Sequence, residues 1–428
     1  MKRALISQIS HEWKENLWLV IELLIVAVVI WTLSLFIIRT IRNYNYPRGF
    51  DEEGVYYADV LHSDTDGNDW LKRFRSGECS EEEIDRHLQD QKALLEQIRA
   101  LSMVESAAFG GNAMPYNYNF YGNDIQLISN KNDTIQVFCN ERFMTPECAK
   151  VLRLHSVNGL TTDQLADVLR NNQLIVGQSA MTINDGLNLK EQAGKPAISS
   201  RYETDFTIGA VIDGIQRNRY EIFIPATVIY PVTEGSAEIL WHNTLLLRLR
   251  PGTEKEFERT IEENPALLRY RDAYIDSMQS LASDGVARHW RSDVRQRTII
   301  AGVLLLLFIV FLGLLGTFWF RVYVRTSEIA VRKSFGATDA DILRRFLSEA
   351  MLLLSTAFIP AVAIVIYGVR RLADSYFGEI TYFKGWGWDM ALGGLLTFAV
   401  MALMILIGVG IPARRAMKIQ PAIALKEE

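Results

Sequence analysis

Four long apolar blocks interrupt an otherwise mixed sequence. Each block supplies the roughly 20 predominantly apolar residues that a helix needs to cross a bilayer. The block that starts at Leu17 is too long for the apolar part of a secretory signal, and no small-residue cleavage pattern follows Ile38, so we expect it to remain as an anchor. The pattern predicts four transmembrane α-helices, over residues 17–38, 298–320, 346–369 and 388–411.

Between the first two blocks, short strand-like runs alternate with helix-like runs. Residues 54–61 and 103–109 are typical of strands, and residues 80–100 are typical of a helix that Ser80 caps and acidic residues open. We therefore expect a large α+β domain over residues 39–297. Two halves of this domain are expected over 39–109 and 199–276. An inserted subdomain rich in Asn, Tyr and Gly is expected over 110–198, and a helical stalk over 277–297 runs into the second apolar block.

The net charge of −5 conceals an uneven distribution, because basic residues gather beside the apolar blocks. Short Lys- and Arg-rich flanks favour the cytoplasm, which assigns residues 1–16, 321–345 and 412–428 to that side. The expected fold is thus a membrane protein of four transmembrane α-helices, with a large extracytoplasmic α+β domain between the first and second helices and an extracytoplasmic loop over 370–387. Five basic residues oppose this topology: Arg39, Arg42, Arg48, Arg370 and Arg371.

The cytoplasmic segment 321–345 is predicted to form two helices joined by an elbow. Glu328 precedes Arg332 by four residues, the favourable order for an ion pair, and Lys333 also lies near the end of the first helix, where cations suit the helix dipole. Gly336 is expected to end that helix with a positive φ. Thr338 and Asp341 have the spacing of a helix cap with a reciprocal acidic partner. An alternative is a solvated loop whose charge only sets topology.

The apolar blocks contain few polar groups, so they form a poor lining for an aqueous conduit. Glu22 and Glu349 are functional candidates, because ionisable residues inside a membrane are costly. Their structural alternative is neutralisation by snorkelling or by nearby Arg344 or Arg345. Glycines in the second and fourth blocks are expected to let helices approach closely: Gly313, Gly316, Gly393, Gly394, Gly408 and Gly410.

The three cysteines all lie in the predicted extracytoplasmic domain. Cys139 and Cys148 are close enough in sequence to bridge a small loop, but Cys79 would then be left over. Free buried thiols are an equal alternative.

Several kinds of chemistry are not encoded by any recognisable motif. Gly194-Lys195 lacks the upstream glycine of a phosphate-binding loop and is followed by Pro196. The six histidines have no paired spacing, no G-x-S-x-G elbow occurs, and no basic nucleic-acid footprint is present. We therefore expect no catalytic residue, no metal, no bound cofactor and no nucleic-acid partner in this chain.

Two motifs resemble those of MacB/FtsX-type permease subunits of ABC transporters. Residues 328–350, EIAVRKSFGATDADILRRFLSEA, are similar to the family pattern of E-I-G, basic residues, L-G-A, I, F-L and E-A, with Ala330 in place of Gly. Residues 412–416, PARRA, and 421–425, PAIAL, are similar to the family's C-terminal ending. The first apolar block departs most, because it lacks the family's R-x-x-L-T-x-L-G-I-x-I-G-type sequence.

The resemblance implies a bacterial inner-membrane permease with both termini in the cytoplasm. A separate ATPase, carrying ATP and magnesium, would bind the elbow and drive porter-like halves of the outer domain to export or extract a substrate. The implied partners also include a second or homologous permease, a periplasmic adaptor and membrane lipids. An FtsX-like regulator of cell-wall hydrolases and, from another class, a membrane-anchored sensor or scaffold remain alternatives. The implied ATPase-coupling residues are Glu328, Ile329, Arg332, Lys333, Gly336 and Ala337.

Overall fold

The computed structural model describes most of the chain in two compact units. The helical unit comprises Met1–Arg42 and Arg295–Glu428, and the sheet unit comprises Asn43–Val294. The described residues are 13–45, 47–63, 70–116, 122–128, 134–178, 189–199, 201–202, 204–215, 226–241, 243–377 and 386–417. The PAIAL motif, residues 421–425, lies outside them.

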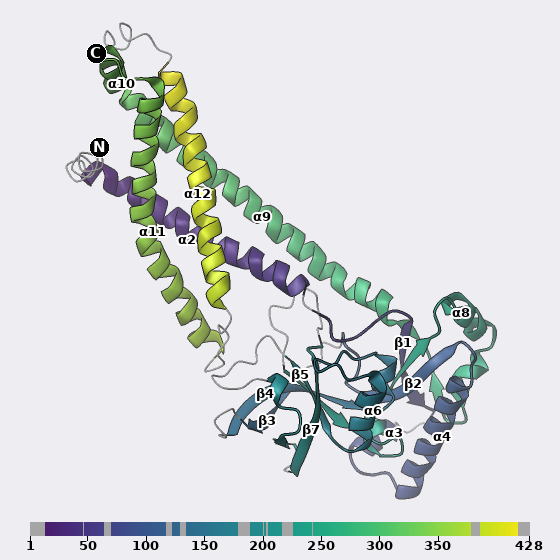
Figure 1. Ribbon diagram of the computed structural model, residues 1–428. Helices are drawn as coiled ribbons and strands as arrows, with labels where there is room; N and C mark the ends of the chain where they lie inside the picture. The colour runs from purple at the N-terminus through teal and green to yellow at the C-terminus, as the bar shows by residue number, and fades with distance from the viewer. Residues whose placement is uncertain are drawn as a thin grey trace. The chain divides into compact units, whose positions relative to one another are not determined.

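Four described helices are long and apolar enough to cross a membrane (Figure 1), which confirms the predicted fold class. Their membrane-spanning portions are 17–42, 293–324, 339–369 and 387–416. A short helix, α10 (Thr326–Ser334), separates the second from the third. The four long helices are α2 (Trp13–Tyr44), α9 (Leu281–Val324), α11 (Asp339–Phe377) and α12 (Trp386–Ala416).

The core of the helical unit joins α2, α11 and α12 through small and aliphatic side chains. Leu23, Leu354 and Met401 are fully buried there. Trp31 of α2 stacks on Phe358 of α11, with ring centroids 5.4 Å apart. A Cβ on Gly394 of α12 would lie 2.8 Å from the Trp31 ring, so this predicted glycine lets α12 approach α2. Among the other predicted glycines, a Cβ on Gly313, Gly316 or Gly410 would have no described atom within 4 Å.

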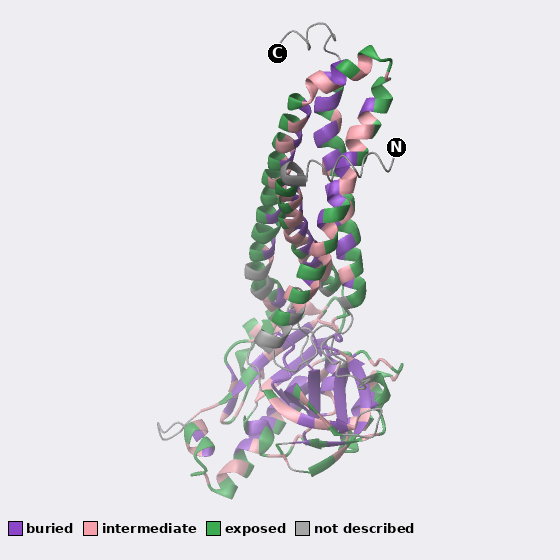
Figure 2. Ribbon diagram, turned by 90° about the vertical axis from the view of Figure 1, so that its left-hand side faces the viewer, coloured by how far each residue is buried: buried purple, intermediate pink, exposed green. Residues whose placement is uncertain are grey.

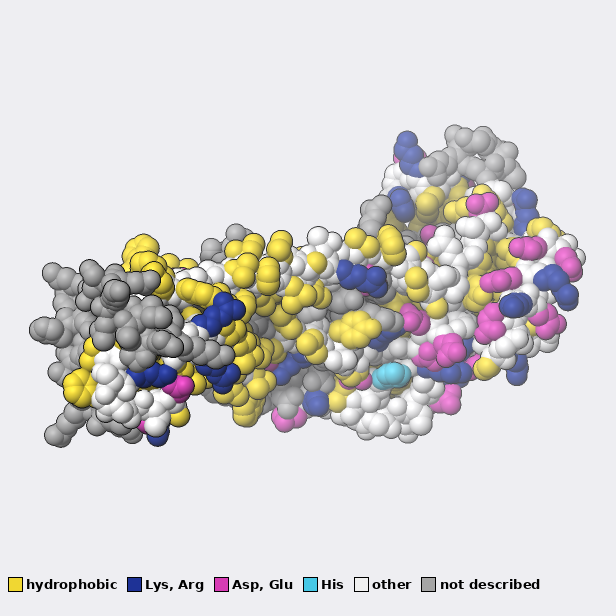
Figure 3. Space-filling view, turned by 90° about the horizontal axis from the view of Figure 1, so that it is seen from above, with side chains coloured by type: hydrophobic (Ala, Val, Ile, Leu, Met, Phe, Trp, Pro, Cys, Tyr) yellow, Lys and Arg dark blue, Asp and Glu magenta, His cyan; other side chains and the backbone are white. Residues whose placement is uncertain are grey.

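The α9 helix is the least covered of the four. In its most apolar stretch 11% of the residues are buried, compared with 28–33% in the corresponding stretches of the other helices. Hydrophobic side chains cover the helices, whereas acidic and basic side chains gather on the sheet unit (Figure 3). This distribution is the one expected of a unit whose outer solvent is lipid.

The described strands of the sheet unit form one continuous sheet with an open part and a closed part. The open part has the order β10-β11-β1-β9-β2, with β12 beside β1. Its strands are β1 (Val55–His62), β2 (Val104–Gly111), β9 (Thr244–Leu249), β10 (Arg269–Tyr270), β11 (Ala273–Ile275) and β12 (Gln279–Ser280).

The closed part has the strand order β4-β3-β6-β7-β5-β8. It closes into a ring because its last strand, β8, also pairs with its first strand, β4. The end of β4 also pairs with β2, which joins the ring to the open part. The strands of the ring are β3 (Gly122–Ile128), β4 (Thr134–Met144), β5 (Leu174–Gln178), β6 (Pro196–Ser199), β7 (Thr204–Asp213) and β8 (Ala226–Pro231).

The ring corrects the predicted boundary of the inserted subdomain at residue 198. Strands β5 and β6, from within 110–198, pair with β7, which follows the boundary. The sheet therefore continues across residue 198. A domain boundary at that point would leave the buried backbone groups of β5, β6 and β7 without their partners, which would be costly.

Alternate residues of the open strands face two separate hydrophobic cores. Ala107 and Leu247 face a core that α4 (Glu81–Arg99) covers, whereas Ala108 and Leu246 face the core beside α5 and α6. Buried residues accordingly fill the strands (Figure 2). The remaining short helices of this unit are α3 (Trp70–Arg75), α5 (Cys148–Val151), α6 (Thr162–Arg170), α7 (Glu238–Trp241), α8 (Glu254–Glu263), η1 (Leu189–Glu191) and η2 (Pro265–Leu268).

Two local predictions in the sheet unit are confirmed. The Ser80 hydroxyl accepts a hydrogen bond of 3.2 Å from the Glu83 amide and caps α4, whose first turn is acidic. The helix α9 runs without a break from Leu281 to Val324, so the helical stretch predicted before the second apolar block continues into it.

Candidate functional site

The elbow turns between α10 and α11 by means of a glycine. Gly336 has φ +88°, and the amides of Gly336 and Ala337 bond back to the carbonyls of Lys333 and Arg332 at 3.0 and 3.1 Å. These bonds satisfy the last carbonyls of α10. The predicted stop at Gly336 is confirmed.

The first turn of α11 is capped as predicted. The Thr338 hydroxyl accepts a hydrogen bond of 3.2 Å from the Asp341 amide, and the Asp341 carboxylate accepts one of 3.3 Å from the Thr338 amide. The Asp341 amide also donates to the Thr338 carbonyl at 3.1 Å, so backbone and side-chain bonds together fix the first turn of α11 beside the glycine.

One face of the elbow is buried against the ends of the long helices. Ile329 is 2% exposed and packs with Val322, Ile342 and Met417. The implied part of Ile329 in coupling to an ATPase stays a prediction, and its covered side chain means that it would act through the packing of α10 on the membrane helices. Ile329 thus anchors α10 to the membrane helices.

The opposite face of the elbow exposes apolar side chains that the sequence reading missed. Phe335 is 88% exposed and Val331 is 41% exposed. Phe335 ends α10 directly before the glycine turn. The available signal was an aromatic residue within an otherwise polar run, because exposing a large aromatic to water needs a reason such as a partner.

The charged elbow residues are partly engaged within the unit. The predicted pair of Glu328 and Arg332 forms at 2.7 Å on the α10 surface. Lys333 pairs with Asp339 at 2.8 Å and also donates to the backbone carbonyl of Met417. These interactions orient the cations but leave them half-buried rather than enclosed.

Glu349 joins the elbow to the membrane helices. Its side chain is almost covered, with the residue 6% exposed, and it pairs with Arg321 at 2.7 Å and with Arg325 at 2.9 Å. The predicted partners, Arg344 and Arg345, are thus replaced by two cations from the end of α9 and the start of α10. Glu349 lies beside buried Ala350, on the face of α11 that packs inward. Glu22, the second predicted acid, accepts a hydrogen bond of 3.1 Å from the Thr317 hydroxyl of α9.

A second buried ion cluster lies at the other end of the helical unit. Asp389 in the first turn of α12 is fully buried and pairs with Arg39 at 2.7 Å and Arg42 at 2.9 Å, both from α2. Two of the basic residues that opposed the predicted topology are therefore neutralised by a carboxylate, which sequence spacing alone does not reveal.

The predicted candidate disulfide does not form. Cys139 and Cys148 are separate buried thiols, and Cys79 is likewise a thiol. Cys139 lies in the core that α4 covers, whereas Cys148 lies in the opposite core and donates to the Phe109 carbonyl at 3.1 Å. The sheet separates the two sulfurs, and burial raises the pKa of the Cys148 thiol to about 12.

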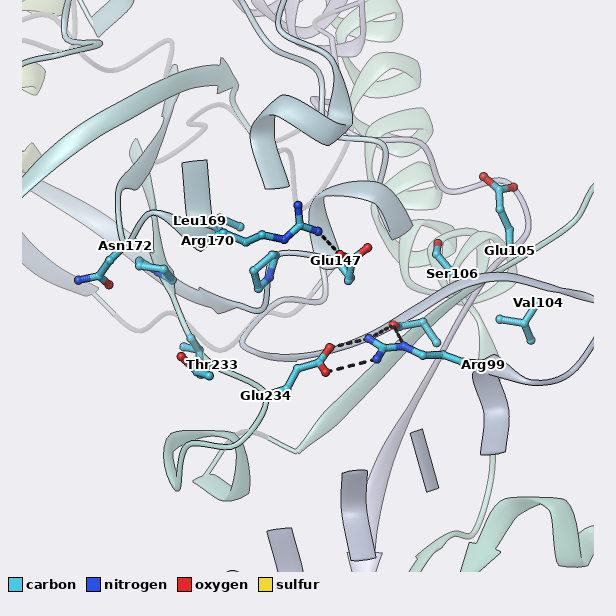
Figure 4. Close-up of a pocket in the computed structure, with 14 residues that line it drawn as sticks. Arg99, Val104, Glu105, Ser106, Glu147, Leu169, Arg170, Asn172, Thr233 and Glu234 are labelled. Carbon is cyan, nitrogen blue, oxygen red and sulfur yellow. Dashed lines mark hydrogen bonds and ion pairs between the residues drawn. The ribbon is translucent and has the colours of Figure 1, made fainter. Parts of the chain in front are cut away.

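The sheet unit contains an open pocket of about 770 Å³ beside the start of β2 (Figure 4). Arg99 pairs with Glu234 at 2.5 Å and donates to the Ala107 carbonyl at 2.8 Å, and Arg170 pairs with Glu147. The volume lies within the range of about 300–1,000 Å³ that ligand sites occupy. Sequence reading missed this pocket because its residues come from distant segments.

Two histidines that appeared scattered in the sequence meet in the sheet unit. The Nδ1 atoms of His62 and His87 lie 3.0 Å apart, and the His87 ring stacks on Trp70. Burial, and then the neighbouring His87, lower the pKa of His62 to about 4. Among the described residues, no group of three or more candidate ligands could hold a metal ion.

This histidine pair predicts a loss of stability in acid. Between the ordinary histidine pKa of about 6.5 and the folded value of His62, the unfolded chain binds more protons, so the free energy of unfolding falls as pH falls, by up to about 1.4 kcal/mol per pH unit. The melting temperature of the chain should drop from about pH 7.5 to about pH 5, and drop less in His62→Gln. Equal drops in both proteins would contradict the assignment.

Comparisons with known proteins match both units in part. Residues 300–421 match the family model described as FtsX-like permease C-terminal. MacB of Sodalis glossinidius, named a macrolide export ATP-binding/permease protein, is 27% identical over 275 residues, which is 63% of this chain and 39% of that protein. The ABC transporter permease YknZ of Bacillus subtilis, named as uncharacterized, is 33% identical over 129 residues, 30% of each chain. The crystal structure of the extracellular domain of a YknZ transporter from Gram-positive bacteria aligns over 52% of this chain and all of its own, with 9% identity and a TM-score of 0.28.

Four helices long and apolar enough to cross a membrane, together with the matched segment 300–421, indicate a multi-pass membrane protein with an FtsX-like permease C-terminal domain. Its segment 300–421 matches the FtsX-like permease C-terminal family, and the chain is similar to MacB and YknZ over part of its length. It spans less than two fifths of the length of these curated relatives.

Proposed function

We propose that this chain is the membrane subunit of a MacB-like ABC system and that a separate ATPase docks on its elbow. The observation that carries the proposal is the exposure of Phe335, at 88%, on the tip of a capped and otherwise well-packed turn. Buried aromatic anchors dominate the energy of most protein interfaces, and this one has no cover within the described part of the helical unit.

The elbow is built to pass motion into the membrane helices. Ile329 packs into the core at the ends of these helices, and Glu349 of α11 is paired with Arg321 of α9 and with Arg325. A displacement of α10 would therefore move α9 and α11 together, since separating the ion cluster would leave buried charges unpaired.

ATP and magnesium belong to the partner in this proposal. The permease would convert closure of the ATPase into movement of the sheet unit, which exports or extracts a substrate on the far side. The few polar groups within the spans support force transmission rather than passage of a solute. The large two-part sheet unit supports a MacB-like transporter over an FtsX-like regulator.

The proposed setting is a bacterial inner membrane, with the termini and the elbow in the cytoplasm and the sheet unit outside it. Neutralisation of Arg39 and Arg42 by Asp389 supports this orientation, because paired arginines no longer count against export of the flank. The sparsely covered α9 supports pairing with a second or homologous permease, and a periplasmic adaptor would complete the assembly.

Co-purification from membranes tests the proposal. The wild-type chain should retain a nucleotide-binding protein, and the double charge reversal of Arg332 and Lys333 to Glu should release it. The matched control reverses Lys255 and Arg259, two exposed cations on α8 of the sheet unit. Recovery of no nucleotide-binding partner by the wild-type chain would refute the proposal and favour a membrane-anchored sensor or scaffold.

A further inference from the structure

The beginning of α9, up to Val294, belongs to the sheet unit and packs within it through a contact that only glycine permits. Gly285 is buried, and a Cβ built on it would lie 2.7 Å from Cε2 and 3.2 Å from Cζ of Tyr116, and 3.3 Å from a Glu52 carboxylate oxygen. Glycine inside a helix costs about 1 kcal/mol relative to alanine. Close approach of the helix backbone to the Tyr116 ring accounts for its presence here.

The Tyr116 ring is fixed on its other sides. Tyr116 is 1% exposed, and its hydroxyl donates a hydrogen bond to the Glu52 carboxylate. The Arg48 guanidinium pairs with the same carboxylate and lies 3.4 Å from the Tyr116 oxygen. Phe50 meets the ring edge-on, with centroids 5.6 Å apart. The ring therefore cannot yield without breaking a charge-assisted hydrogen bond in a partly buried site.

The four residues Arg48, Glu52, Tyr116 and Gly285 form what we call the root cluster. Arg48 and Glu52 belong to the segment that follows α2, and Gly285 belongs to α9. Both covalent connections between the sheet unit and the membrane helices therefore meet at one cluster. Leu281, at the first position of α9, is fully buried in the same hydrophobic core as Phe50 and Tyr116.

We propose that the root cluster is where movement of α2 and α9 enters the sheet unit, with Gly285 and Tyr116 as positioning residues. This inference rests on the proposed function, because it requires motion driven from the elbow. A helix backbone in direct contact with a fixed ring transmits a displacement with little loss, since packed interiors deform little. A side chain placed between them would push the two apart and loosen the hydrogen bonds of the ring.

The chain itself supplies a matched pair of substitutions. Gly285→Ala inserts a methyl group into the contact with Tyr116. Gly302→Ala changes the same helix in the same way, but a Cβ on Gly302 has no atom within 4 Å. Tyr116→Phe is a milder third variant, because it keeps the ring and removes only the hydroxyl that bonds Glu52.

The experiment uses the full chain with its co-purified ATPase in lipid nanodiscs. Hydrogen exchange of peptides covering α4 and β1 is compared with and without ATP plus vanadate, and ATP hydrolysis is measured in parallel. The wild type and Gly302→Ala should show the same nucleotide-dependent change in exchange. Gly285→Ala should reduce that change about fivefold or more, the low end of coupling between sites, and Tyr116→Phe should reduce it less. ATPase binding should persist in all variants.

A full nucleotide-dependent change in Gly285→Ala would overturn the inference. Unfolding of the sheet unit by Gly285→Ala would be visible as raised hydrogen exchange without nucleotide. In that case Tyr116→Phe is the deciding variant, and a full nucleotide-dependent change in Tyr116→Phe would overturn the inference. Failure of the proposed function has a different signature, because the wild-type chain would then retain no ATPase.

Discussion

Replacing Phe335 with alanine is expected to release the ATPase from the elbow. The truncation removes an aromatic side chain that is 88% exposed and packs on nothing in the described helical unit, so the permease itself should stay intact. Loss of a central aromatic anchor typically costs about 2 kcal/mol or more in binding, equivalent to roughly 30-fold weaker affinity. Co-purification of the ATPase, quantified against the yield of permease, measures the effect.

Phe335 is a cleaner probe than the basic residues beside it. Arg332 and Lys333 also pair with Glu328 and Asp339, so reversing their charge disturbs the elbow as well as its partner. The control for Phe335→Ala is Phe138→Ala, because Phe138 is an exposed phenylalanine of the sheet unit. If Phe335→Ala retains the ATPase at the wild-type level, the tip of the elbow is not part of the interface with the ATPase.

Replacing Asp389 with asparagine is expected to destabilise the helical unit strongly. The carboxylate is fully buried and pairs with both Arg39 and Arg42, so asparagine removes two ion pairs that join α2 to α12. Breaking a buried ion pair in this way typically costs about 3–5 kcal/mol. Thermal unfolding of the detergent-solubilised chain should shift clearly to lower temperature.

Restoring charge balance should recover part of this loss. A triple variant that combines Asp389→Leu with Arg39→Leu and Arg42→Gln removes the unpaired charges along with the ion pairs. Asp205→Asn, at an exposed position of β7, controls for loss of one acid. A melting temperature for Asp389→Asn equal to that of Asp205→Asn would show that the cluster does not hold α2 to α12.

Local signals predicted the parts of this protein that depend on neighbouring residues. The apolar blocks gave the four helices, and the spacing of Thr338 with Asp341 gave the cap that the elbow uses. Gly336 likewise has the predicted positive φ. Each of these features is decided within a few residues of chain, where helix periodicity and capping chemistry operate.

The features that prediction missed depend on residues far apart in the sequence. Snorkelling or the nearby Arg344 or Arg345 were the neutralising partners that sequence proximity offered for Glu349, yet Arg321 and Arg325, from before α11, pair with it. The burial of Ile329 could not be foreseen from the elbow alone, because the ends of three other helical segments cover it. The closure of the ring by β4 and β8 is equally invisible, because strand patterns do not specify which strands become neighbours.

The position of β9 has a consequence for how the protein is made. β1 is the first strand of the sheet unit, ending at His62, but its neighbour β9 begins only at Thr244. Because β9 lies between β1 and β2, neither strand can gain that partner until nearly the whole unit has left the ribosome. Such late pairing leaves strand edges exposed in the nascent chain. Biogenesis of this protein should therefore depend on a chaperone that holds the sheet unit until β9 is available.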